Sequence, residues 1–215
     1  YDMTIFKDLV DRYSIKNTKL IKWLINYLTS ASTKSLSLNK IYNTLKSEGH
    51  KLGKDTLYEY LSMLEDCFFV LAIHRFDPSV KNEGSTLPKV YLDDVGFMSL
   101  FSETELGKRL ENAVFLKLMR NKLDDPLMDL HYFKSIDGKE VDFVITRARK
   151  PVMAVQACQS LSNMATNERE MDSLLVGMDK LGLDEGIIVT RHEETVRKVG
   201  GKKIRIVPLW KWLLE

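Results

Sequence analysis

The chain has 215 residues, of which 29% are charged and 44% are hydrophobic, and its formal net charge is +2. This length allows one large domain or two small ones with a real core, and the composition is that of an ordinary globular protein. The longest apolar runs are strand-sized, which excludes a transmembrane helix of the usual length, and so small a net charge does not by itself predict a nucleic-acid partner.

The two cysteines indicate a reducing environment. Cys67 and Cys158 both lie in apolar segments that predict strands. We expect buried thiols at these positions rather than a disulfide or a metal site. Because no signal peptide is visible either, the predicted location is cytoplasmic, with no membrane association.

The first third of the sequence predicts helices. Apolar residues recur at helical spacing in 4–13 and 18–29, and again in 37–49, where Ser37 is the expected N-cap. The segment Lys54–Asp66 carries one apolar stripe, and a short apolar ribbon follows it. Three helices followed by a ribbon predict a winged helix, with Lys54–Asp66 as its recognition helix.

The expected recognition helix is a poor match for DNA. Off its apolar stripe it carries the carboxylates of Asp55, Glu59 and Glu65, which would repel phosphates, and it has no arginine. Lysines that could contact a DNA backbone are Lys34, Lys40, Lys46, Lys51 and Lys54. The preferred interpretation is a winged helix that packs against another domain or protein, and the alternative is a DNA-binding element.

A segment rich in Pro, Gly, Ser and Asn, Asp77–Pro88, is typical of a wing tip or linker. Beyond it the pattern changes from helical to mixed. We therefore predict a helical winged-helix domain with its linker at residues 1–88 and an α/β domain at residues 89–215.

The second domain predicts a mixed α/β fold. An amphipathic helix over 103–121 precedes five predicted strands, which lie at 130–135, 140–146, 152–158, 186–190 and 203–208. A long helix at about 166–181 separates the third strand from the fourth. The last segment, 208–215, predicts a helix that docks Leu209, Trp210 and Leu213.

Alternation along two of these strands groups polar residues on one face. In the strand at 140–146, Val141, Phe143 and Ile145 are expected on one face, so Asp142 is expected on the other. In the next strand the same spacing groups Ala154, Gln156 and Cys158.

Glu111 lies near the start of the helix that we expect to cover the sheet. An aspartate from one strand, Gln156 from the next and a glutamate from a preceding helix form a recognisable constellation. Carboxylates hold a divalent cation, which positions water and stabilises charge on a phosphate. The alternative is that Glu111 and Asp142 are ordinary polar residues at the margins of their elements.

Other familiar sites are missing from the sequence. It contains no GxxxxGK[ST] loop, which excludes an ATP site of that kind. It has no HExxH or CxxC spacing for zinc and no GxSxG elbow for a nucleophilic serine.

Several segments together resemble the C-terminal half of a large group of prokaryotic AAA-type ATPases. They are "KVYLDDVGF", "GKRLENAVFLKL", "GKEVDFVI", "GIIVT" and "IRIVPLWKWLL". In that group a winged helix, which "TLYEYLSMLEDCFFVLAI" resembles, and a domain of unknown function follow the ATPase module. The last domain is similar to the PD-(D/E)xK nuclease fold. The resemblance implies an ATPase module upstream of Tyr1 as a partner.

The nuclease pattern maps onto this sequence with two departures. Its helix glutamate matches Glu111 and its strand aspartate matches Asp142, whereas its (D/E)xK matches Gln156-Ala157-Cys158. Losing one preorganised electrostatic group costs roughly 3–4 kcal/mol, about a hundredfold to a thousandfold in rate. A lysine that has migrated from the motif has three candidates, Lys117, Lys134 and Lys139.

These observations predict a catalytically degenerate nuclease-like module that serves binding or regulation within an AAA-type ATPase. Its site residues are Glu111, Asp142 and Gln156, with Glu111 and Asp142 as ligands of a Mg²⁺ ion. Two alternatives stay open, an active metal-dependent nuclease that uses the same residues and a non-specific adaptor that binds DNA through lysines.

Overall fold

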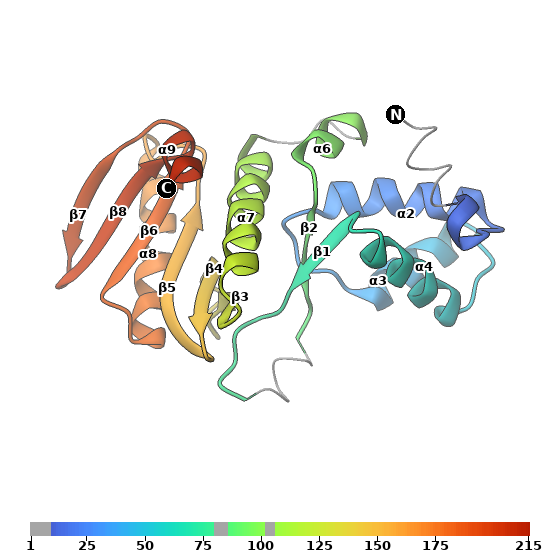
Figure 1. Ribbon diagram of the computed structural model, residues 1–215, viewed down its shortest axis with the longest axis horizontal. Coiled ribbons are helices and arrows are strands. Elements are labelled where there is room, and N and C mark those ends of the chain that lie inside the picture. The colour runs from blue at the N-terminus through green and yellow to red at the C-terminus, as the bar shows by residue number, and fades with distance from the viewer. Residues whose placement is uncertain (1–9, 80–85, 102–105) are drawn as a thin grey trace. The chain divides into compact units, whose positions relative to one another are not determined.

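The computed structural model describes residues 10–79, 86–101 and 106–215 (Figure 1). By its internal contacts the chain divides into two units. The first comprises Tyr1–Ala72 and Val90–Thr104, and the second comprises Ile73–Lys89 and Glu105–Glu215. The division predicted above, at 1–88 and 89–215, stays a prediction.

The first unit is helical, as the apolar spacing predicted. Its helices are α2 (Thr18–Ala31), α3 (Leu38–Ser47), α4 (Lys54–Asp66) and α6 (Val95–Phe101). Ser37 is the N-cap of α3, as predicted, and its side chain accepts a hydrogen bond from the backbone N–H of Lys40. Gly49, just after α3, takes a left-handed φ of 84°, the conformation that glycine adopts most readily at the end of a helix.

The core of the first unit is built from the apolar stripes of these helices. Its fully buried residues include Leu20, Leu24, Leu28, Ile41, Leu45, Leu57 and Leu64. The strands β1 (Val70–Ile73) and β2 (Lys89–Leu92) pair in a two-stranded sheet. Three helices and this sheet follow the predicted order, and the winged-helix fold itself stays a prediction. Residues 4–9 of the first predicted helix and 80–85 of the predicted wing tip lie outside the described residues.

The second unit is built on a mixed six-stranded sheet. Its elements are α7 (Leu106–Asp124), β3 (Met128–Lys134), β4 (Glu140–Arg147), β5 (Lys150–Ala157), α8 (Met164–Leu181), β6 (Glu185–Thr190), β7 (Thr195–Val199), β8 (Lys202–Pro208) and α9 (Leu209–Leu214). The strand order is β3-β4-β5-β6-β8-β7. The mixed α/β class is confirmed.

Chain connections explain why this sheet is mixed. β3, β4 and β5 form an antiparallel meander, whereas β5 reaches its parallel neighbour β6 through the crossover helix α8. β8 is parallel to β6, and β7 pairs antiparallel with β8. The sequence did not predict β7, because "TVRKV" lies on an exposed edge and carries little apolar pattern.

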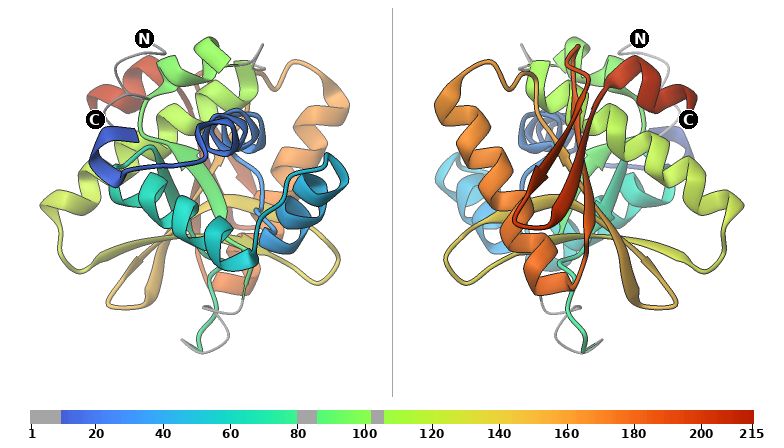
Figure 2. Two further views of the ribbon diagram at one scale, coloured as in Figure 1. Left: turned by 90° about the vertical axis from the view of Figure 1, so that its right-hand side faces the viewer. Right: turned by 90° about the vertical axis from the view of Figure 1, so that its left-hand side faces the viewer.

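Helices cover the two faces of this sheet (Figure 2, right). Val144 of β4 packs in the core beneath α8, whereas its neighbour Phe143 stacks on Phe115 of α7, with 6.4 Å between the ring centroids. Since adjacent strand residues point to opposite faces, α8 covers one face and α7 the other. α9 packs against α7, β6 and β8 and therefore lies on the same face as α7.

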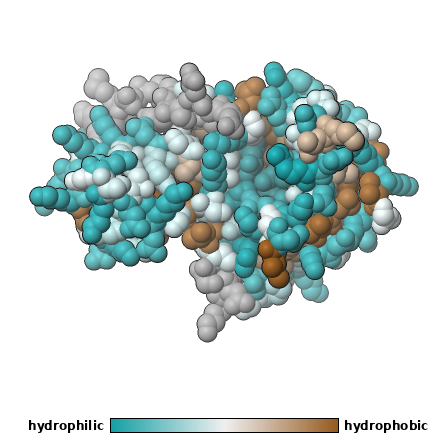
Figure 3. Space-filling model, turned by 180° about the vertical axis from the view of Figure 1, so that it is seen from behind, coloured by the Kyte–Doolittle hydropathy of each residue, from teal (hydrophilic) through white to brown (hydrophobic). Residues whose placement is uncertain are grey.

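The outward side of α8 is polar. Glu168, Arg169, Asp172, Asp179 and Lys180 are exposed on it. Figure 3, which shows the molecule from behind, has many hydrophilic residues on its right-hand side, with patches of hydrophobic ones among them. None of the helices in the described parts of the chain is long and apolar enough to cross a bilayer.

The final helix corrects one prediction. Trp212 is its buried residue, whereas Trp210 is 60% exposed and Leu213 is 41% exposed. The predicted docking of Trp210 and Leu213 is therefore wrong, whereas Leu209 is partly buried. A helix of six residues contains too few turns for its apolar spacing to select one face.

Both cysteines are free, as predicted. Cys158 is buried just after β5, and burial, together with the nearby charge of Glu170, raises the pKa of its thiol to about 11. Cys67 ends α4 rather than lying in a strand and is only partly buried, so the predicted burial is confirmed for Cys158 alone. Partial burial still raises the pKa of the Cys67 thiol. A thiol with a raised pKa is protonated at neutral pH and therefore unreactive.

Candidate functional site

The centre of the candidate site is Lys89, the first residue of β2. Its ammonium nitrogen Nζ lies 2.9 Å from Oε1 of Glu140, 3.1 Å from Oε1 of Glu111 and 3.2 Å from Oδ1 of Asp142. Helix α7 supplies Glu111, and strand β4 supplies the other two carboxylates. We call these four residues the Lys89 cluster. All of them belong to the second unit.

The Lys89 cluster is withdrawn from solvent. Lys89 is only 2% exposed, and Asp142 is buried as well. Nζ also lies 5.9 Å from the centre of the Tyr132 ring, whose hydroxyl donates a hydrogen bond to the carbonyl oxygen of Leu87 at 2.8 Å. Burying an ammonium is costly unless opposite charges surround it, which the three carboxylates do here.

A β-bulge places Asp142 in the cluster. Along the β3–β4 pairing, His131 lies opposite Val144 and Phe133 lies opposite Val141, so two residues of β4 face the single residue between them on β3. As a result, Val141 and Val144 both lie in the core beneath α8. The prediction that Val141, Phe143 and Ile145 share one face is therefore wrong, because the bulge interrupts the alternation.

Side chains replace the backbone ladder between β4 and β5 beyond the bulge. The ladder ends at the pair Phe143–Val155. One residue further on, the N–H of Asp142 donates to Oε1 of Gln156 at 3.2 Å. In return, the N–H of Ala157 donates to Oδ2 of Asp142 at 3.0 Å. Asp142 is thus held by both strands as well as by Lys89.

Gln156 is fixed through both atoms of its amide. Its Oε1 accepts from the backbone of Asp142, and its Nε2 donates to Oε2 of Glu170 on α8 at 2.7 Å. Ala154 and Cys158 lie in the core beneath α8, and Glu170 belongs to that helix. The predicted shared face of Ala154, Gln156 and Cys158 is therefore confirmed.

Glu170 is a member of the site that the sequence did not predict. Its other oxygen, Oε1, accepts hydrogen bonds from Arg169 Nη2 at 2.6 Å and Nε at 3.2 Å. The signal was present, because Glu170 lies one turn before Leu174 and two turns before Gly177 on the buried face of α8. A carboxylate on an apolar stripe indicates a buried partner.

The carboxylates of the cluster differ in their proton affinity. Burial raises the pKa of Asp142 above its ordinary value, and the attraction of Lys89 opposes this shift only in part. Burial also acts to raise the pKa of Glu140. There the charge and hydrogen bonds of Lys89 and Lys134 outweigh it, and the pKa lies below its ordinary value.

A polar pocket of about 430 Å³ opens beside the cluster. Glu111, Asp142 and Gln156 all line it, so the structure brings the three predicted site residues together. Other lining residues include Gly107, Lys108, Cys158, Thr166, Arg169 and Glu170. The catalytic role predicted for Glu111, Asp142 and Gln156 stays a prediction, as does the metal-binding role predicted for Glu111 and Asp142.

The cluster in this arrangement does not fit a resident Mg²⁺ ion. Such an ion needs oxygen ligands at about 2.0–2.1 Å in octahedral geometry. Lys89 Nζ already lies within 3.2 Å of the oxygens of Glu111 and Asp142, the two predicted ligands, and fills the space between them. Among the described residues, no group of three or more His, Cys, Asp or Glu side chains is placed to hold a metal.

The lysine at the site is not one of the three expected candidates. Lys139 pairs with Asp172, Lys134 pairs with the far oxygen of Glu140 at 3.0 Å, and Lys117 lines a different pocket. Lys89 could have been suspected from "KVYL", in which a lysine opens a strand whose residues are all buried. Its partners, however, lie 22 and 53 residues away in the sequence.

Two family models, both described as domains of unknown function, match different parts of the chain. Residues 106–212 match the model described as "Domain of unknown function (DUF4143)", and residues 1–107 match that of "Domain of unknown function (DUF8612)". No solved structure matches the chain.

Two curated relatives resemble nearly the whole chain. An uncharacterized protein of Methanocaldococcus jannaschii is 34% identical over 220 residues, which cover 99% of this chain and 48% of that protein. An uncharacterized protein of Haemophilus influenzae is 27% identical over 222 residues, which cover 100% of this chain and 51% of that protein. The chain therefore spans about half the length of the curated relatives it matches.

Proposed function

We propose that the second unit is a nuclease-like module that does not cleave DNA and that serves binding or regulation within an AAA-type ATPase. The observation that carries this proposal is the position of Lys89, whose ammonium lies between the two carboxylates expected to hold a metal, Glu111 and Asp142. In this proposal Lys89 takes the place of the divalent cation and keeps the acidic cluster folded without it.

The nuclease-like part of the proposal is supported by the order of the elements. A helix with Glu111, a strand with Asp142 and a following strand with Gln156 converge on one pocket, as the family resemblance implies. The relatives are about twice as long as this chain, which leaves room for an additional module such as the ATPase that the resemblance implies.

Chemistry at the site supports the absence of cleavage. An ammonium group has no open coordination position, so Lys89 cannot bind and activate a water molecule as a metal does. Gln156 uses both amide atoms within the protein and brings no charge. Cys158, whose thiol pKa is about 11, is neutral at physiological pH and cannot replace the ammonium of a catalytic lysine.

A second candidate function is an active metal-dependent nuclease. It is favoured by one observation, that Lys89 supplies at the site the ammonium that β5 lacks. In this candidate Lys89 moves off Glu111 and Asp142 when a metal and DNA arrive. A third reading, a DNA-binding adaptor, relies on the lysines of the first unit. It is disfavoured by the exposed carboxylates of α4.

A plasmid-nicking assay with Mg²⁺ or Mn²⁺ separates these functions, with the wild type beside Asp142→Ala. We expect no nicking above background from either protein. If the wild type nicks the plasmid and the substitution abolishes this activity, the non-cleaving proposal is wrong and the protein is a nuclease. A salt-sensitive shift of the DNA band without nicking would favour the adaptor.

A further inference from the structure

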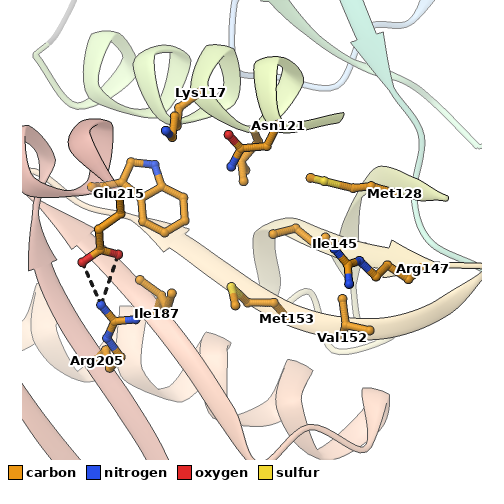
Figure 4. Close-up of a pocket in the computed structure, with 12 residues that line it drawn as sticks. Lys117, Asn121, Met128, Ile145, Arg147, Val152, Met153, Ile187, Arg205 and Glu215 are labelled. Carbon is orange, nitrogen blue, oxygen red and sulfur yellow. Dashed lines mark hydrogen bonds and ion pairs between the residues drawn. The ribbon is translucent and has the colours of Figure 1, made fainter. Parts of the chain in front are cut away.

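A second pocket lies on the opposite side of the sheet from α8, between α7 and α9. Its volume is about 420 Å³, within the range of small-molecule sites. Figure 4 shows Lys117 and Asn121 entering it from α7, and Val152, Met153 and Ile187 facing them from the sheet. Every residue that lines it belongs to the second unit.

The floor of this pocket is apolar and adaptable. Met128, Ile145 and Ile187 form buried parts of it, and Met153 and Val152 continue it toward solvent. Val152 is nearly half exposed, which marks the mouth. Methionine side chains are flexible and polarisable, so a floor that contains two of them accepts alkyl or aryl groups of different shapes.

The wall opposite this floor carries hydrogen-bond donors that have no partner among the described residues. The indole N–H of Trp212, on α9, is buried and makes no hydrogen bond to any residue that the structure describes. Lys117 forms no ion pair or hydrogen bond within the described part of the chain. Because the indole nitrogen is itself buried, the donor open to a ligand is the ammonium of Lys117, whose complement is an acceptor, preferably an anionic one.

Two other cations at the rim are already neutralised. Arg147 pairs with Asp125 at 2.7 Å, and Arg205 holds Glu215 through both carboxylate oxygens at 3.0 and 3.2 Å (Figure 4). Among the described residues that line the pocket, Lys117 is therefore the cation that remains to attract a ligand. Because it stands over an apolar floor, it favours a ligand with one negative charge and an apolar body.

We propose that this pocket binds an organic carboxylate with an apolar chain. The carboxylate contacts Lys117, and the chain packs on Met128, Ile145, Met153 and Ile187 beside the ring of Trp212. A free carboxylic acid and the C-terminus of a peptide that ends in an apolar residue both present this chemistry. The site is independent of the Lys89 cluster, because none of the residues of that cluster lines it.

The test is a calorimetric titration of sodium octanoate into the full chain, with octanol as the uncharged counterpart. In parallel, the indole NMR signal of Trp212, identified by its loss in Trp212→Phe, reports contact at the pocket. A peptide with a C-terminal leucine, compared with its C-terminal amide, separates the two sources of carboxylate. We expect octanoate or the free-acid peptide to bind and to shift the indole signal, and octanol and the amide to bind more weakly.

Lys117→Met keeps the length of the side chain and removes its charge. We expect it to weaken binding at least roughly tenfold, because a hydrogen bond to a charged group is among the stronger ones. Lys122→Met, on the same helix but outside the pocket, is the matched control and should bind like the wild type. Equal binding by Lys117→Met and the wild type would overturn the proposal, as would the absence of binding by both octanoate and the peptide. If Lys117→Met does not fold, Trp212→Phe must show the weaker binding instead.

Discussion

Lys89 is the cation that balances the carboxylates of the candidate site. Its ammonium is held by three carboxylates from α7 and β4 and is almost fully buried. A buried ion pair adds little stability over an apolar core, but removing one partner leaves the remaining charges buried and unpaired. Within the cluster, the substitution that lowers stability most should therefore be that of Lys89, which contacts all three carboxylates.

Lys89→Met should lower the free energy of unfolding by about 3–5 kcal/mol, because Glu111, Glu140 and Asp142 then lose their shared cation. We expect Mn²⁺ to recover part of this loss by binding among the carboxylates. Urea denaturation with and without Mn²⁺ measures both effects. The control is Lys122→Met, which breaks an exposed pair with Asp129 and should change stability by less than about 1 kcal/mol. A variant as stable as the wild type would contradict the role given to Lys89.

Asp142→Asn tests the raised pKa of this carboxyl. A folded-state pKa above the unfolded value of about 3.9 means that the folded protein is destabilised as Asp142 ionises, so this contribution is lost as pH rises. The variant cannot ionise there. Its unfolding free energy minus that of the wild type should therefore increase as pH is raised from about 4 toward 7. A difference that falls over this range in urea titrations would show that Lys89 outweighs burial.

The predictability of the site depends on whether a sequence pattern marks each of its members. Glu111, Asp142 and Gln156 could be found because strand alternation or the family pattern marks their positions. Lys89 and Glu170 reach the site from β2 and α8. Contacts between such separate elements depend on how the elements pack, and the apolar periodicity of the sequence does not predict this packing.

At the level of elements, the bulge in β4 and the close approach of α8 to this strand involve the same residue, Val141. The bulge turns Val141 toward α8, and Gly177 of α8 lies directly over it. A Cβ atom at Gly177 would meet Cγ2 of Val141 closer than real Cβ contacts allow. This glycine therefore serves packing, although in an isolated helix it would be unfavourable.

Gly177→Ala should destabilise the protein by about 1–3 kcal/mol, because the added methyl overpacks the contact with Val141. Gly107→Ala in α7 is the matched control, since its Cβ would meet nothing within 4 Å. Helix propensity alone predicts that this control is unchanged or more stable by up to about 1 kcal/mol. Thermal and urea unfolding of the two variants, compared with the wild type, decide the matter. Equal gains at both positions would mean that α8 stands further from β4 than the structure shows.

Most elements could be predicted from sequence because their patterns are strong. The helices α4 and α8 and the strands of the central sheet follow apolar spacing, and their bounds agree with expectation within a few residues. The misses have physical causes. The edge strand β7 has little apolar pattern, and the bulge at Asp142 shifts the alternation without changing the composition of β4.

At the scale of the molecule, the second unit is not one continuous stretch of chain. Residues 73–89 belong to it, although they precede most of it in sequence. They contribute Lys89 to the cluster. His74 and Phe76 also cover the edge of β3, where the backbone N–H of Tyr132 donates to the carbonyl of His74 and the carbonyl of Tyr132 accepts from the N–H of Phe76. The matched family region, 106–212, does not contain them.

A fragment of residues 106–215 should therefore be less stable than a fragment of residues 73–215, by at least about 3 kcal/mol, because its carboxylates lack Lys89. Chemical denaturation of the two fragments side by side measures the difference. Adding Lys89→Met to the longer fragment apportions the loss between the cation and the covered edge of β3. Equal stability of the two fragments would contradict the membership of 73–89 in this unit.

The covalent attachment of Lys89 has a consequence for the dependence of the fold on its surroundings. A metal ion stabilises a protein by mass action, so its contribution changes with the concentration of free ion and vanishes in a chelator. The contribution of an ammonium group that belongs to the chain does not depend on the concentration of any free ion. The cation of the Lys89 cluster is part of the chain itself, so we expect the stability of the wild type to be the same in magnesium-rich and magnesium-starved solution.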